Sequence, residues 1–168
     1  MVDAPSDPAR TAQPSDKFIA AFASASSAGC VLELKYRLLA DMRPTLRPVA
    51  RAQKLGDVES AIVNEYRPHL SEREVKLLND VRVLRNKVLH CDFDVAHEKL
   101  RDMGVHLLDG LVTQVNVSTG DATPVTADVE WKPVFGWLLQ SAMSGMFKQA
   151  ELRFYDVIAV IDRLLALG

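Results

Sequence analysis

The sequence predicts an all-α fold, a mostly up-and-down bundle of four to five helices with a small β-like or loop insertion before the last helix. Three observations predict it. Apolar residues recur at helical spacing over most of the 168 residues, and proline or glycine separates the periodic segments. With 48% hydrophobic and 25% charged residues, the composition is typical of one soluble globular domain. Residues 1–15, with three prolines, are expected to form a disordered tail, and residues 16–168 one helical domain.

The first helix is predicted from a long amphipathic stripe. From Phe18 to Leu39, apolar and small residues recur at alternating spacings of four and three. Ser15 or Asp16 is the expected N-cap. The helix should end near Met42, because Pro44 disfavours helical geometry in the residue before it.

The segment 18–30, FIAAFASASSAGC, resembles the apolar core of a secretion signal that ends in Ala-Gly-Cys. Three features argue against export: acids precede it, Ser27 stands where an aliphatic residue is usual, and the helical stripe runs through the supposed cleavage point. No stretch is expected to be long and apolar enough to span a bilayer. We therefore expect a cytoplasmic protein with no membrane partner. Cys30 and Cys91 have no metal-ligand spacing and fit buried or incidental thiols in a reducing compartment.

The segment Thr45–Lys54 is strongly basic. Three of its cations would share one face of a helix, which fits either a solvated surface or a rail for a phosphate backbone. Gly56 should end this piece, and Asp57 should cap a short helix that runs towards Tyr66. Pro68 should break that helix. The three cations of this face are Arg47, Arg51 and Lys54, and Arg43 stands just before the segment.

A capping box, Ser71 with Glu74 three residues on, predicts the start of a central helix that runs to His90. Arg85 falls within the apolar face of this helix. A guanidinium in that position is costly unless it is paired or lines a cleft. Arg82 falls between the apolar face and the side that carries Asn79, Asn86 and His90. The apolar face consists of Leu77, Leu78, Val81, Leu84, Val88 and Leu89.

The spacing alone leaves two interpretations open. In the first, Arg85 reaches past its stem to the helix edge, or pairs with a buried carboxylate purely for structure, and His90 is a cation that suits the helix macrodipole. In the second, the two residues belong to a functional site. Residues five apart lie about 140° apart on a regular helix, so Arg85 and His90 converge only at a frayed helix end or across a dimer.

The C-terminal half is predicted to contain two more helices around the insertion. Asp92 or Asp94 should cap a helix from about Val95 towards Gln114. The insertion, about 115–131, is β-prone around a turn, and the last helix runs from Pro133 almost to the C-terminus. His97-Glu98 is not part of a zinc motif, because Arg101 stands where the second histidine should be. We expect no metal and no other cofactor.

The segment Leu84–His90, LRNKVLH, resembles the signature of the HEPN superfamily (higher eukaryotes and prokaryotes nucleotide-binding). That signature is an arginine, four to six residues and a histidine, often with an asparagine directly after the arginine. In this chain it stands at the end of an amphipathic helix in a small and apparently all-helical domain, which is where members of the superfamily carry it.

The resemblance implies a metal-independent endoribonuclease that cuts single-stranded RNA by attack of a 2′-hydroxyl on the adjacent phosphate. The implied catalytic residues are Arg85, Asn86 and His90, and Arg82 is the candidate for substrate binding. Histidine exchanges protons near neutral pH, and arginine offers a planar set of donors to a phosphate. Glu33, in the first helix, is a candidate partner for Arg85. The family also implies a symmetric homodimer in which two motifs share one cleft. Because the formal net charge is −2, RNA would need a local basic patch.

Two alternatives remain open. The chain could be a non-catalytic regulator or interaction protein, similar to mannitol-operon repressors, in which the Arg–Asn–His cluster only ties helices together. It could also be a toxin-like protein that is neutralised by an antitoxin or works with a nucleotidyltransferase partner.

Overall fold

The computed structural model describes residues 16–105 and 136–168. Within these ranges the chain forms five α-helices and one short 3-10 helix, Arg67–His69, and no strand. The predicted all-α bundle is therefore confirmed. The predicted tail and the predicted insertion lie outside the described residues. The helices are α1 (Asp16–Met42), α2 (Leu55–Glu65), α3 (Glu72–Leu89), α4 (Phe93–Asp102) and α6 (Gly136–Leu165).

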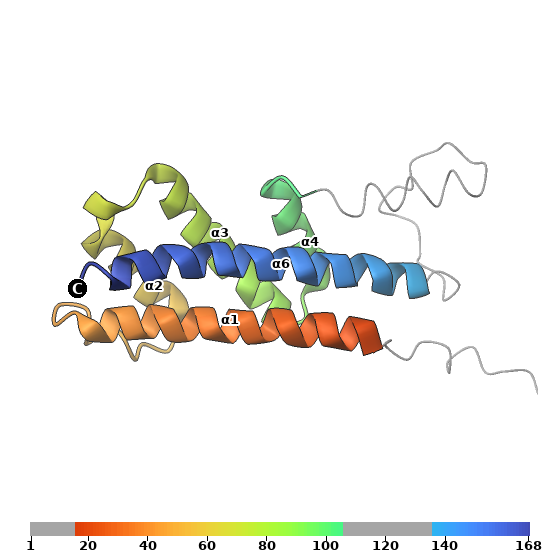
Figure 1. The fold of residues 1–168 in the computed structure, drawn as a ribbon, viewed down its shortest axis with the longest axis horizontal. Coiled ribbons are helices and arrows are strands. Elements are labelled where there is room, and N and C mark those ends of the chain that lie inside the picture. The colour runs from red at the N-terminus through yellow and green to blue at the C-terminus, as the bar shows by residue number, and fades with distance from the viewer. Residues whose placement is uncertain (1–15, 106–135) are drawn as a thin grey trace, which may run out of the picture.

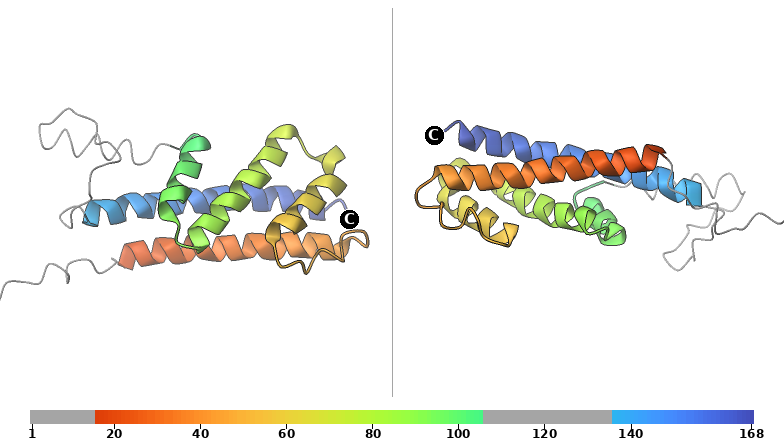
Figure 2. Two further views of the ribbon diagram at one scale, coloured as in Figure 1. Left: turned by 180° about the vertical axis from the view of Figure 1, so that it is seen from behind. Right: turned by 90° about the horizontal axis from the view of Figure 1, so that it is seen from below.

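The two longest helices, α1 and α6, lie side by side and run in the same direction (Figure 1). Ser24 donates a hydrogen bond to Glu151 at 2.8 Å, and Lys35 pairs with Asp162, so both contacts join residues 127 positions apart. The other helices, α2, α3 and α4, lie against one face of this pair (Figure 2). The central helix α3 contacts each of the other four, in agreement with its predicted position.

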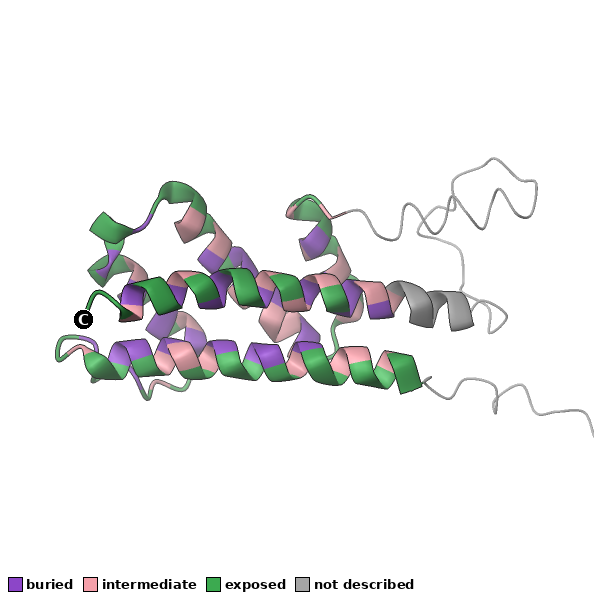
Figure 3. Ribbon diagram, in the orientation of Figure 1, coloured by how far each residue is buried: buried purple, intermediate pink, exposed green. Residues whose placement is uncertain are grey.

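The core lies between these two layers. The buried sides of α1 and α6 face the shorter helices, as the burial colours show (Figure 3). The predicted stripe of α1 is buried from Ala25 to Leu39, and Phe18 and Phe22 at its start are partly buried. The hydrophobic effect, through the burial of these apolar side chains, is the main contribution that holds the layers together. The largest fully buried aromatic residues are Tyr36, Tyr66, Phe147 and Phe154.

Helix α3 begins at the predicted capping box. The hydroxyl of Ser71 accepts a hydrogen bond from the backbone N–H of Glu74 at 3.2 Å, and the Glu74 carboxylate accepts one from the backbone N–H of Ser71 at 2.8 Å. Such a cap stabilises a helix by about 1 kcal/mol. The capping box therefore fixes the register in which the apolar face of α3 meets the core.

A Schellman motif ends α3 at the candidate site. The N–H of Cys91 donates to the carbonyl of Val88 at 3.1 Å, and the N–H of Asp92 donates to that of Lys87 at 2.8 Å. This motif needs a left-handed residue after the C-cap, usually a glycine. Here Cys91 takes that conformation, with φ of 59°, although its side chain makes it unfavourable. The C-cap itself is His90.

Two predicted boundaries in the middle of the chain are wrong. The segment 43–54 is a series of turns and not a helix, because Pro44 and Pro48 lack the N–H that a helix needs. Gly56 does not end this segment but lies in the first turn of α2, which starts at Leu55 with Lys54 as its N-cap. Asp57 is in that first turn as well, so it is not the cap.

Helix α4 is shorter than predicted. It ends at Asp102 and not near Gln114, because Gly104 adopts φ of 89°. The N–H groups of Gly104 and Val105 donate to the carbonyls of Arg101 and Leu100, which is a second Schellman motif with a glycine in the left-handed position. Asp92 occupies the N-cap position as expected, without a side-chain cap bond. The rest of the predicted helix, from residue 106 to Gln114, lies outside the described residues.

Helix α1 is long and apolar enough to cross a membrane, contrary to the expectation that no stretch would be. Only 22% of its most apolar window is buried within the fold. Length and composition alone also admit a core helix or a signal sequence, so the cytoplasmic location stays a prediction.

Cys30 and Cys91 are both exposed and unpaired, which excludes buried thiols and leaves incidental ones.

We predict that Cys91→Gly stabilises the protein. Glycine adopts the left-handed conformation without the steric cost of a Cβ atom, and the gain should be roughly 0.5–1 kcal/mol in the free energy of unfolding. Urea denaturation measures this difference. The control is Cys91→Ala, which removes the thiol but keeps Cβ and should give no gain. Equal stability of the glycine and alanine variants would contradict the assignment of strain to this residue.

Candidate functional site

The four predicted site residues line one cleft of about 330 Å³. Arg82, Arg85, Asn86 and His90 reach it from α3. One acidic side chain, that of Glu33, comes from α1. The opposite wall is the start of α2 with the residues before it, of which only Lys54 had been predicted to bind phosphate, as part of the basic rail. These wall residues are Gln53, Lys54, Leu55, Gly56 and Asp57.

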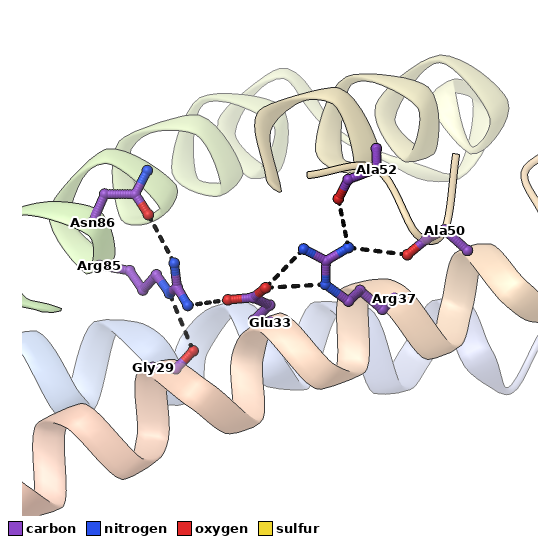
Figure 4. Close-up of polar contacts among 7 residues, drawn as sticks. All are labelled: Gly29, Glu33, Arg37, Ala50, Ala52, Arg85 and Asn86. Atoms are coloured by element: carbon purple, nitrogen blue, oxygen red, sulfur yellow. Dashed lines mark hydrogen bonds and ion pairs between the residues drawn. The ribbon is translucent and has the colours of Figure 1, made fainter. Parts of the chain in front are cut away.

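Arg85 is shielded and held from three directions (Figure 4). Its side chain is only 12% exposed and forms an ion pair with the carboxylate of Glu33. Its Nη1 donates to the side-chain oxygen of Asn86 at 2.9 Å, and its Nε donates to the carbonyl of Gly29 at 3.4 Å. The predicted carboxylate partner of Arg85 is therefore confirmed, and it is Glu33. The guanidinium does not extend to the exposed edge of the helix.

Gly29 makes this approach possible. A Cβ atom at Gly29 would lie 3.3 Å from Cγ of Arg85 and 3.5 Å from the ring of Phe154. The first distance is tighter than most real contacts of a Cβ atom. The absence of a side chain at this position therefore lets the stem of Arg85 pack on the backbone of α1.

Glu33 bridges two arginines. One carboxylate oxygen pairs with Arg85, and the other accepts hydrogen bonds from Nε and Nη2 of Arg37 at 3.0 and 2.8 Å. Arg37 also donates to the carbonyls of Ala50 and Ala52 at 3.1 and 2.8 Å. The chain Arg37–Glu33–Arg85 thus joins α1, α3 and the turns of residues 43–54. The sequence analysis missed Arg37, although its spacing of four from Glu33 is a common signal for a helical ion pair.

The trio of Arg37, Glu33 and Arg85 carries a formal charge of +1. A guanidinium has five N–H donors, and the structure gives those of Arg85 three acceptors. Two N–H groups of Arg85 therefore have no acceptor among the residues that the structure describes. An excess positive charge with spare, fixed donors suits an anionic oxygen ligand.

Arg82 is fixed in a similar way by a second acid. Its Nε lies 2.9 Å from a carboxylate oxygen of Glu59, close enough for an ion pair, although the N–H is not aligned for a hydrogen bond. Its Nη2 donates to Asn79 at 3.0 Å. A Cβ atom at Gly56 would lie 3.5 Å from Nη1, so the guanidinium lies over the start of α2. The Arg82 side chain is 23% exposed.

Glu59 lies behind Arg82 and is buried. Burial raises the pKa of its carboxyl group from 4.5 to about 7, against the opposing effect of the Arg82 charge. Its neighbour Tyr36 is fully buried, and its hydroxyl has no hydrogen-bond partner among the described residues. Burial, followed by the charge of Glu59, raises the pKa of Tyr36. The sequence analysis missed Glu59, because its burial depends on how α2 packs and not on the local sequence.

His90 is exposed at the end of α3. No hydrogen bond or ion pair engages its ring within the part of the chain that the structure describes, and only its backbone N–H is bonded, to the carbonyl of Asn86. The side-chain oxygen of Asn86 points to Arg85, so in this arrangement Asn86 orients the arginine. The imidazole is therefore free to meet a ligand in the cleft.

The predicted basic rail does not form, because its residues do not share a helix face. Arg47 donates to the carbonyl of Asp41 at 3.1 Å. Arg51 lines a separate hollow between Leu34 and Ala50. Of the three cations of the predicted rail, only Lys54 lines the cleft. Arg43 donates to the hydroxyl of Tyr66 at 2.7 Å and lies over its ring.

Comparison of the chain with protein-family models, with curated proteins and with solved structures gives no match. Membership of a family therefore remains a proposal, which depends on the motif from Arg85 to His90 and on its setting. Among the described residues, no three His, Cys, Asp or Glu side chains gather in a way that could hold a metal ion.

We predict that Glu59 makes the protein less stable as the pH rises towards 7. Because its folded pKa is about 7 and its ordinary value is 4.5, the folded state keeps a proton that the unfolded state loses between these values. The stability that this retained proton provides is therefore fully present below about pH 4.5 and is lost by about pH 7. The free energy of unfolding should fall by an amount on the order of 3 kcal/mol over this range. Urea denaturation across this pH range measures the loss.

Glu59→Gln should flatten this pH profile, since the amide does not titrate. The matched control is Glu65→Gln on the same helix, where the side chain is exposed, and it should keep the profile of the parent protein. If Glu59→Gln loses stability over the same pH range as the parent, the assignment is wrong.

Proposed function

We propose that the chain is a metal-independent endoribonuclease of the HEPN type that cleaves single-stranded RNA, with the cleft as one half of a dimeric site. One observation carries the proposal. The arginine, asparagine and histidine of the motif line a single cleft, where Arg85 is immobilised and still has unused N–H donors.

In the proposed reaction, the 2′-hydroxyl oxygen forms a bond to the adjacent phosphorus and the bond from phosphorus to the 5′-oxygen breaks. One imidazole accepts the proton of the 2′-hydroxyl, and another donates a proton to the 5′-oxygen. The products are a 2′,3′-cyclic phosphate and a free 5′-hydroxyl. The attack requires a flexible strand with a 2′-hydroxyl, which favours single-stranded RNA over duplex DNA.

Arg85 would stabilise the negative charge that develops on the phosphoryl oxygens. Its orientation is set in advance by Glu33, Asn86 and the carbonyl of Gly29, so little reorganisation accompanies the reaction. A lysine would offer a point charge without the planar set of donors. Arg82, which lines the same cleft, would bind the substrate and not take part in the chemistry.

The proposed site needs two chains. A cleft with one histidine supplies either the acid or the base at a given moment, whereas the reaction uses both. A twofold axis beside α3 would bring a second Arg85 and a second His90 to the same phosphate. The proposed partners are therefore RNA and a second copy of the chain.

One observation favours a non-catalytic alternative. The bonds of Arg85 to Glu33 and Gly29 tie α3 to α1, and this contact alone could justify an arginine in an apolar face. In that case the protein would be a regulator or interaction protein of the same fold. Activity of the purified protein decides between the two functions.

We predict that the purified protein cleaves mixed single-stranded RNA in the presence of EDTA and leaves cyclic phosphate ends. His90→Ala should lower the rate by roughly 10²–10⁴-fold, because it removes the general acid and base, while RNA binding persists. The control is His69→Ala, an exposed histidine outside the cleft, which should keep full activity. Cleavage by His90→Ala at the parental rate would rule out this role.

We predict that the active form is a dimer with twice the mass of the 18.6 kDa chain, as measured by light scattering during size exclusion. Arg85→Lys should keep the fold and lose most activity, because lysine cannot replace the planar donors. Arg85→Glu should abolish activity and weaken the dimer, because both clefts then change at once. A stable monomer at micromolar concentration with full nuclease activity would contradict the composite site.

A further inference from the structure

The cleft extends beyond the HEPN-like motif to a second group of polar residues. Its far wall is formed by the residues from Gln53 to Asp57, which lead into α2. The side chain of Lys54 is exposed on this wall and forms no ion pair with the residues that the structure describes. It differs in this from Arg82 and Arg85, each of which has a carboxylate behind it.

Arg82 lines the same cleft and lies against the wall that carries Lys54. Its guanidinium is held by Glu59 and Asn79 and rests against Gly56, so it faces the wall that carries Lys54. Asn79 accepts an aligned hydrogen bond from its Nη2, and its Nε is buried against Glu59, which leaves three of the five N–H donors without a partner among the described residues. A fixed arginine and a lysine without an ion pair, from two different elements, thus line the same cleft beside Gly56.

We propose that Lys54 and Arg82 form a subsite for the phosphate that neighbours the one at Arg85 and His90. This subsite rests on the proposed function and names its substrate more closely: a single-stranded segment with at least two consecutive phosphates. A cleft of about 330 Å³ is at the small end of ligand sites, which fits one nucleoside between two phosphates.

Asp57 provides a second substitution whose effect on phosphate binding should be opposite to that of Lys54. It lines the same wall as Lys54, and its carboxylate opposes an anionic ligand. Replacement of Lys54 by a neutral residue should therefore weaken the binding of the second phosphate, and Asp57→Asn should strengthen it. A purely structural role of this wall would not produce opposite effects from the two substitutions.

The test uses two 2′-O-methylated oligouridylates, a dimer with one phosphodiester and a trimer with two. They cannot be cleaved by the proposed reaction, because the attacking hydroxyl is blocked. Fluorescence anisotropy measures their affinity for the full chain. The parent protein should bind the trimer roughly tenfold more tightly than the dimer, as expected for one charge-assisted contact. Lys54→Gln should reduce this gain to about twofold or less, and Asp57→Asn should increase it.

The matched control is Lys148→Gln, which neutralises an exposed lysine on α6 outside the cleft and should keep the full gain. Three results would overturn the subsite: Lys54→Gln keeps the full gain in affinity of the trimer over the dimer, both lysine variants lose this gain equally, or neither oligonucleotide binds. Failure of the proposed function gives a different result. The parent protein would then not cleave unmodified RNA, but it would still bind the trimer more tightly than the dimer in a way that depends on Lys54. Cleavage without such a gain would refute the subsite alone.

Discussion

The ion pair between Glu33 and Arg85 is the contact on which the rest of the site depends. A guanidinium in the apolar face of α3 is tolerable only because a carboxylate from α1 meets it. Loss of one partner from a fully buried pair costs about 3–5 kcal/mol. The cost here should be smaller, since Glu33 is 28% exposed and solvent screens the pair. The same arginine packs closely on α1 at Gly29, and both partners of the ion pair line the cleft.

The structural and the catalytic interpretations of Arg85 are compatible. The three acceptors that tie it to α1 and to Asn86 also fix the direction of its remaining donors. A catalytic arginine benefits from such restraint, because less conformational entropy is lost when a phosphate binds. What distinguishes a nuclease from a scaffold here is therefore His90, whose ring makes no polar contact with the described residues although it lines the cleft.

The sequence predicted those features that depend on local chemistry. The capping box at Ser71, the extent of α1 and the need of Arg85 for a carboxylate all follow from neighbouring residues or from the cost of an isolated charge. Pro48 and Gly104 could have indicated that residues 43–54 are not a helix and that α4 ends early. The helical spacing of the basic residues, and of the apolar residues after Val95, favoured longer helices instead. The burial of Glu59 and the place of the second wall beside α3 were beyond sequence reasoning, because they arise only when α2 packs against α3. Lys54 of that wall had been predicted to bind phosphate, but as part of a helical rail that does not form.

The placement of acids behind both arginines explains how a chain with a net charge of −2 could recognise an anion. Glu33 cancels part of the positive charge in the cleft, and Glu59 does so as the pH rises above its pKa of about 7, so long-range attraction of a polyanion is weak. In return, both guanidinium groups are held in fixed orientations before a ligand arrives. Recognition would then come from a few directed hydrogen bonds to phosphate oxygens and from the unpaired Lys54, and it would select the geometry of a phosphodiester over negative charge in general.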